Sequence, residues 1–260
     1  MVITRAILAG VLALCVMPLW AMSDEDERER NTAAAIERVV ESHDHSLILG
    51  AGRVFIRQAA IRSARSLLTQ WGGEAGLDAG WNASAAEWRS AEQALLEGAG
   101  QIAKRRFENP SWISEAWQSY TSELLSGEEA DHIAVHFTTE GGRRQRELMD
   151  WFLGETVLFI YTYTDRIQYN LPGSEAEMRQ LQRIARQRVP VEDVEFASKF
   201  ADTLNFIGRD PGLKYWKMLG IPLVGEIVRH IDGVAREIED HLRQRRAVAE
   251  PYIEAFRRGS

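Results

Sequence analysis

Two histidines and a glutamate stand at spacings that suit a metal site. Glu129, His132 and His136 are three and four residues apart, so on a helix they share one face. Imidazole nitrogens at this spacing can share one zinc or copper ion, and a carboxylate can complete part of the shell. The pattern predicts a metal-dependent protein or hydrolase as one hypothesis. The alternative is a solvated helix face, which is favoured because the sequence offers no fourth ligand.

Three arginines form a second candidate site. Arg143, Arg144 and Arg146 follow Gly141-Gly142 at the start of a predicted helix, where positive charge opposes the helix dipole. Backbone N–H groups at a helix start, together with guanidinium groups, can bind a phosphate or a lipid headgroup. We therefore expect an anion site here as a further hypothesis. The alternative is pairing with the nearby acids, which are Glu140, Glu147 and Asp150.

The remaining motifs argue against catalysis. His43 lies on the apolar stripe of its predicted helix, so we expect a core histidine and not a ligand. The segment Gly98–Ala103 matches the dinucleotide pattern G-x-G-x-x-A, but it lies in an amphipathic helix with no strand before it. The sequence contains no phosphate-binding loop, no G-x-S-x-G elbow and no H-E-x-x-H motif. No catalytic or cofactor-binding residue is assigned, and a non-enzymatic protein is favoured.

Helices must position these residues. Apolar side chains recur every three or four residues through 32–260, and no alternating run indicates a strand. The sequence predicts one all-α domain of about nine or ten helices. Gly50 and Gly52 are expected to separate two of them, and Ser126 with Glu129 has the spacing of a capping box. The stretch Trp151–Tyr161 is apolar all round and predicts the central buried helix.

The N-terminal segment predicts export. One positive charge at Arg5 precedes the uncharged run Ala6–Trp20, and the small residues Ala21 and Ser23 suit signal peptidase. We expect a signal peptide at 1–23, cleaved after Ala21 or Ser23, and a charged, solvated tail at 24–31. The alternative is a retained anchor, although fifteen apolar residues fall short of the roughly 20 that span a bilayer. The predicted location is the periplasm or the medium.

Composition narrows the class of the mature chain. Cys15 is the one cysteine and lies in the signal segment, so the mature chain would have no disulfide, no thiol nucleophile and no cysteine metal ligand. The chain is 45% hydrophobic and 27% charged, as in ordinary globular domains, and its net charge is −7. That acidic balance argues against a nucleic-acid partner.

One segment resembles a known family. Residues 117–151 hold a helix that ends in Leu-Ser, an acidic helix start, and then the run His136-Phe137-Thr138-Thr139-Glu140-Gly141-Gly142-Arg143. This run resembles the aromatic-aromatic-x-Ser-Pro-x-Gly-Arg/Lys signature of the bacterial family called domain of unknown function 2059. It departs where His136 replaces an aromatic and Glu140 replaces proline. The resemblance implies a helical hairpin in an exported protein and transfers no catalytic residue.

Together these patterns favour one function over its alternatives. We expect a periplasmic helical protein that binds a partner or component of the cell envelope without catalysis, and that has no transmembrane span once mature. The sequence identifies neither that partner nor the oligomeric state. An exposed apolar groove would favour this interpretation, whereas a fourth ligand near His132 and His136 would favour the metal hypothesis.

Overall fold

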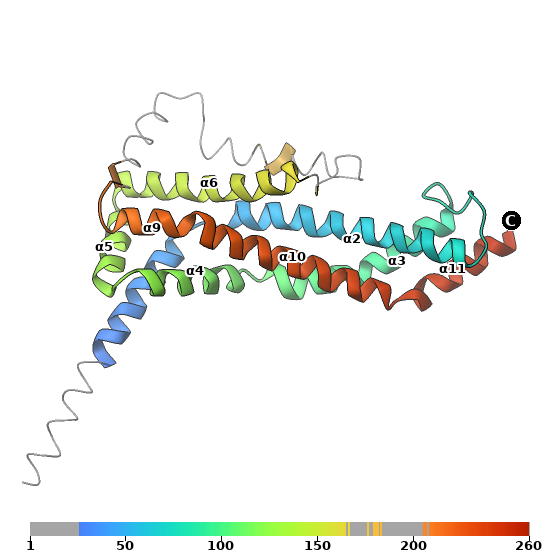
Figure 1. Cartoon of the computed structure of the whole chain (residues 1–260), viewed down its shortest axis with the longest axis horizontal. Helices are drawn as coiled ribbons and strands as arrows, with labels where there is room; N and C mark the ends of the chain where they lie inside the picture. The colour runs from blue at the N-terminus through green and yellow to red at the C-terminus, as the bar shows by residue number, and fades with distance from the viewer. Residues whose placement is uncertain are drawn as a thin grey trace, which may run out of the picture.

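Helices make up the regular structure of this protein. The computed structural model describes residues 26–164, 166, 176, 179–181, 183, 205–206 and 208–259, and no strand occurs among them (Figure 1). The all-α prediction is therefore confirmed. The predicted signal peptide at 1–23 lies outside the described residues. No described helix combines the length and apolar character that crossing a membrane requires.

The described elements follow one another with short connections. A helix at 26–42 comes first. The later elements are α2 (Ser46–Glu74), α3 (Ala86–Ala103), the π-helix η1 (Lys104–Glu108), α4 (Ser111–Leu124), α5 (Gly127–Thr138), α6 (Glu140–Tyr163), α9 (Gly212–Leu219), α10 (Ile221–Arg243) and α11 (Arg246–Gly259).

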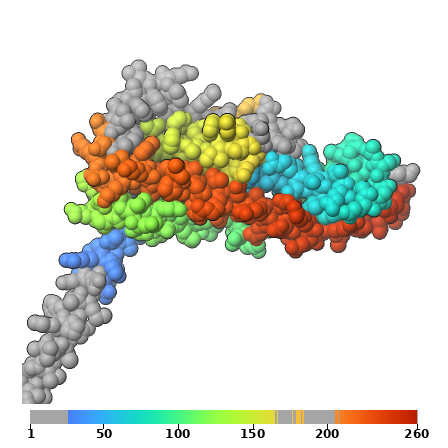
Figure 2. Space-filling model, in the orientation of Figure 1, coloured from blue at the N-terminus to red at the C-terminus, as the bar shows by residue number. Residues whose placement is uncertain are grey.

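The bundle is elongated. Helices α2, α6 and α10 run side by side along much of its length, with α5 and α9 at one end and α11 beside α3 at the other (Figure 1). In the space-filling view, α10 and α11 form a ridge along the visible face (Figure 2). Helix 26–42 projects from the body at its start, whereas Ile36, Val39 and Val40 near its other end are buried.

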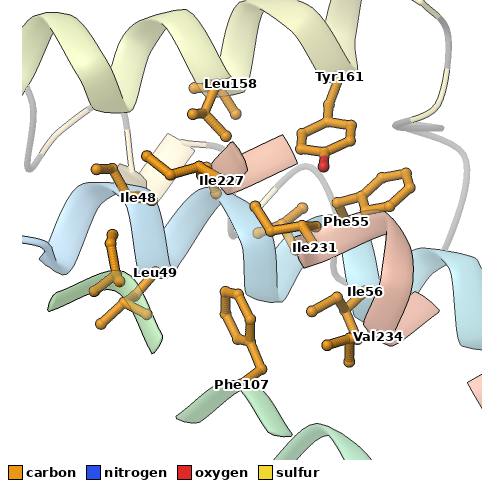
Figure 3. Close-up of a cluster of buried hydrophobic side chains, with 14 of the residues drawn as sticks. Ile48, Leu49, Phe55, Ile56, Phe107, Leu158, Tyr161, Ile227, Ile231 and Val234 are labelled. Carbon is orange, nitrogen blue, oxygen red and sulfur yellow. The ribbon is translucent and has the colours of Figure 1, made fainter. Parts of the chain in front are cut away.

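Helix α2 is the centre of the core. It packs against α10, α6 and α3, and about half of its residues are buried. Figure 3 shows Ile48, Phe55 and Ile56 of α2 enclosed by side chains of the neighbouring helices. Tyr161 of α6 stacks on Phe55 with ring centroids 4.0 Å apart. The core is thus built around α2, which contacts a neighbour on most sides.

Three sequence predictions about these elements are wrong. Trp151–Tyr161 is not a helix buried all round, because Phe152 and Phe159 of α6 are 42% and 65% exposed. Gly50 and Gly52 do not separate two helices, because α2 continues through both. They instead allow close packing: a Cβ on Gly52 would lie 2.4 Å from the ring of Phe107. The expected charged tail is solvated, but residues 26–31 already belong to the first helix.

Candidate functional site

Four buried polar side chains form a hydrogen-bonded chain where helix 26–42 turns into α2. His43 Nδ1 lies 2.5 Å from Asp150 Oδ1, and His43 Nε2 contacts the Tyr215 hydroxyl. Trp117 Nε1 donates to the same hydroxyl oxygen over 2.9 Å. The four residues come from the end of the first helix and from α6, α9 and α4. The network therefore ties four elements together at one point.

The donors fix the direction of every bond in this network. An indole N–H can only donate, so the Tyr215 oxygen accepts from Trp117 and gives its own proton to His43 Nε2. His43 is then protonated at Nδ1 and donates to Asp150. The second oxygen of Asp150 accepts the backbone N–H of Asp44 over 3.0 Å. A neutral His43 satisfies each of these groups.

The order of carboxylate, imidazole and hydroxyl is that of a hydrolytic triad. Two observations argue for a structural role instead. The side chain of His43 is 0% exposed and Tyr215 is fully buried, so no substrate reaches them from solvent. Burial, with a smaller contribution from Asp150, raises the pKa of the Tyr215 hydroxyl well above its ordinary value, so the hydroxyl keeps its proton. The prediction that His43 is a core histidine is confirmed.

His45 lies beside this network at the start of α2. Its ring stacks on Trp117 with centroids 5.0 Å apart, and its buried Nδ1 has no hydrogen-bond partner in the described structure. Burial lowers the pKa of His45 to about 4, and the neighbouring His43 adds to this shift. His45 is therefore neutral at pH 7. Sequence reasoning gave it no partner, because Trp117 is 72 residues away along the chain.

The predicted metal ligands have other contacts. Glu129 completes a capping box with Ser126, as its spacing predicts, and also pairs with Lys214 of α9. His136 Nε2 lies 2.6 Å from Gln145 Oε1, while His132 is exposed. Among the residues that the structure describes, no three His, Cys, Asp or Glu side chains are placed to hold a metal ion. The geometry gives the metal hypothesis no support.

The predicted anion site is divided. Arg144 pairs with Glu140 over 2.5 Å, as the alternative interpretation expects. Arg143 is exposed, and Nε of Arg146 is a buried atom that no described residue bonds. Gly142 fits a tight packing position, since a Cβ there would lie 1.8 Å from the His136 carbonyl oxygen. Anion binding by Arg143 and Arg146 stays a prediction.

A large groove runs between α2 and α3. Its volume is about 1150 Å³, slightly beyond the usual range of about 300–1,000 Å³ for ligand pockets. Small residues make the space: Gly50 and Ala60 on α2 face Ala99, Gly100 and Ala103 on α3. Larger apolar side chains line the rest, namely Leu47, Val54, Ile56, Ile61, Leu96, Phe107, Leu181 and Ile238.

The π-helix η1 shapes one end of this groove. Single turns with the wider i to i+5 pattern often occur at functional sites in helical proteins. Here the turn brings Phe107 and Glu108 to the groove, and Phe107 is held against Gly52 of α2. The sequence offered no marker of this site. Its small residues are spread over two helices and look like ordinary packing positions in each.

Charge is confined to a few of the residues that line the groove. Arg53 and Arg57 are one helical turn apart on α2, and Glu108 on η1 is the one acid among the lining residues. By contrast, the cavity between α3 and α10 is lined mainly by charged and polar side chains. The α2–α3 groove is therefore the site best suited to an apolar ligand.

Comparisons with known proteins identify no relative. The chain matches no protein-family model, no curated protein and no solved structure. The resemblance of residues 117–151 to the family of unknown function stays a prediction.

Proposed function

We propose that this chain is an exported, non-enzymatic binding protein of the cell envelope, and that the α2–α3 groove is its binding site. The observation that carries the proposal is the groove itself, a space of about 1150 Å³ with a largely apolar lining. Apolar surface open to water favours a ligand that removes it from water. The predicted signal peptide supplies the location.

A binding role also fits the placement of the polar groups. The acid, histidine and hydroxyl of the described core, which have the order of a catalytic set, are enclosed by packed aromatic rings. The groove instead offers methyl groups, glycine backbone and a phenylalanine ring. Such a lining can recognise shape and apolar character but supplies no group for acid–base or nucleophilic chemistry.

A neutral fluorescent probe tests this function. N-phenyl-1-naphthylamine brightens in apolar surroundings, so its titration into the mature protein should saturate. Gly100 lines the groove, and a Cβ there would meet nothing within 4 Å. Gly100→Leu should therefore fill the groove without a clash and weaken binding about tenfold, which corresponds to roughly 1.4 kcal/mol.

The matched control is Gly225→Leu. Gly225 lies in α10 away from the groove, and a Cβ at this position also meets nothing within 4 Å. This variant should bind the probe like the unaltered protein. Equal affinity in Gly100→Leu and Gly225→Leu would contradict the assignment of the groove. A fractionation of producing cells tests export: the periplasmic protein should begin at residue 22 or 24.

A further inference from the structure

We propose that the groove selects a free single-chain amphipath with an anionic head, of the fatty-acid type, and that Arg53 binds the head. This inference rests on the proposed function of the groove. It names the chemistry of the ligand and assigns a residue to it.

The placement of Arg53 is the first argument. Arg53 is an exposed residue of α2, lines the groove, and forms no ion pair with any described residue. Most surface arginines of this bundle have a carboxylate beside them, as Arg65 has Glu92 and Arg166 has Asp232. An unpaired guanidinium at an apolar groove can form charge-assisted hydrogen bonds with a carboxylate.

The distribution of charge along the groove is the second argument. The chain as a whole is acidic, with a net charge of −7, yet two of the three charged residues at the groove are arginines. The acid, Glu108, lies on η1 and repels a carboxylate from that end. An anionic head is therefore favoured beside Arg53, away from Glu108.

The apolar section beyond Arg53 suits the chain of the ligand. From Arg53 to Ile61 the groove follows α2 for about 12 Å, at 1.5 Å per residue. Ala60, Leu96 and Ala99 line this section. It has the width of small side chains and offers only dispersion contacts, which fits an unbranched alkyl chain better than a bulky ring system.

Competition between two ligands of equal chain length tests the inference. Decanoate and decan-1-ol share the alkyl chain and differ in the charge of the head. Each should displace the naphthylamine probe, and decanoate should bind about fivefold to tenfold more tightly at low salt. High salt should reduce this preference, because the Debye length falls to about 3 Å at 1 M.

Two variants assign the preference to one residue. Arg53→Gln should bind decanoate and decan-1-ol with equal affinity while still binding the probe. Arg258→Gln changes the same charge on the exposed end of α11 and should keep the preference. A preference that survives in Arg53→Gln, or is lost in Arg258→Gln, would overturn the role of Arg53.

The outcomes separate the two proposals. Displacement by both ligands with equal affinity would overturn the anionic head and leave the groove as a binding site. Binding to vesicles of anionic phospholipid without displacement by decanoate would replace the free amphipath with a membrane surface. Failure of the naphthylamine probe to bind would overturn the proposed function itself.

Discussion

The two flanks of α2 use opposite kinds of side chain. At its N-terminal end, four large aromatic or imidazole rings pack together and every polar atom of the His43–Asp150–Tyr215–Trp117 network has a partner. Along its groove flank, Gly50 and Ala60 face the small residues of α3 and leave space. The first region is closed in both volume and hydrogen bonding, whereas the second is open.

This difference separates what holds the fold from what can bind. Closed regions respond to substitution with lost stability, because removed atoms leave cavities and removed partners leave unsatisfied polar groups. Open regions tolerate added atoms, since nothing has to move. The predictions below test this contrast by measuring stability at both flanks.

The largest effect is expected at the network. Tyr215→Phe removes the hydroxyl that serves both His43 Nε2 and the indole N–H of Trp117, so two buried groups lose their partner. At about 1–3 kcal/mol for each such group, we expect the free energy of unfolding to fall by about 3 kcal/mol. Urea denaturation followed by circular dichroism measures this change.

Tyr161→Phe is the matched control for that substitution. The Tyr161 hydroxyl makes only long contacts of 3.4 Å with the Val228 carbonyl and with Asp232. Its removal should cost less than about 1 kcal/mol. Similar losses in the two variants would contradict the closed network.

A smaller effect is expected from pH at His45. The pKa of its imidazole is lowered from 6.5 to about 4 in the folded protein, so the unfolded chain takes up the proton first as the pH falls. The contribution of His45 to stability is complete above pH 6.5 and is lost as the pH falls to 4. Its size is at most about 3 kcal/mol, at 1.4 kcal/mol per pKa unit, and partial exposure reduces it.

The pH prediction is checked with His45→Gln, which has no proton to take up. Unfolding free energies of both proteins at several values between pH 7 and pH 4 give the difference, in which the titration of the carboxylates cancels. The unaltered protein should lose more stability than the variant over this range. Parallel curves would refute the burial of a neutral His45.

The smallest effects are expected from alanine at two glycines. Gly52→Ala places a Cβ 2.4 Å from the Phe107 ring in the closed core, and overpacking should cost about 1–3 kcal/mol. Gly100→Ala meets nothing within 4 Å at the open groove and should stabilise α3 by up to about 1 kcal/mol through helix propensity. Thermal unfolding shows whether the melting temperatures shift in opposite directions, as this contrast requires.

Local rules predicted some features of the site well. The spacing of Ser126 and Glu129 predicted a capping box, which the structure contains, and the apolar stripe around His43 predicted burial. Both depend on residues within a few turns of one helix. The same local pattern misled for Glu129 as a metal ligand, because Lys214 of α9 pairs with it from 85 residues away.

The break predicted at Gly50 and Gly52 shows a second limit of sequence reasoning. Glycine weakens a helix by itself, so an isolated sequence favours a boundary there. In the folded protein, the contact of Phe107 with Gly52 and of Leu181 with Gly50 uses the missing side chain. Tertiary packing outweighs the propensity, and the boundary instead falls at residues 43–45.

The sequence by itself determined the all-α class, because the helical period is a property of neighbouring residues along one chain. It also supplied the acidic character and the expectation of export. Only the tertiary structure decided which polar residues meet and where space remains, as in the contact of His43 with Tyr215 across 172 residues and in the groove between α2 and α3. Such sites depend on how whole helices pack, and that packing is set by the sum of many weak apolar contacts and not by any local motif.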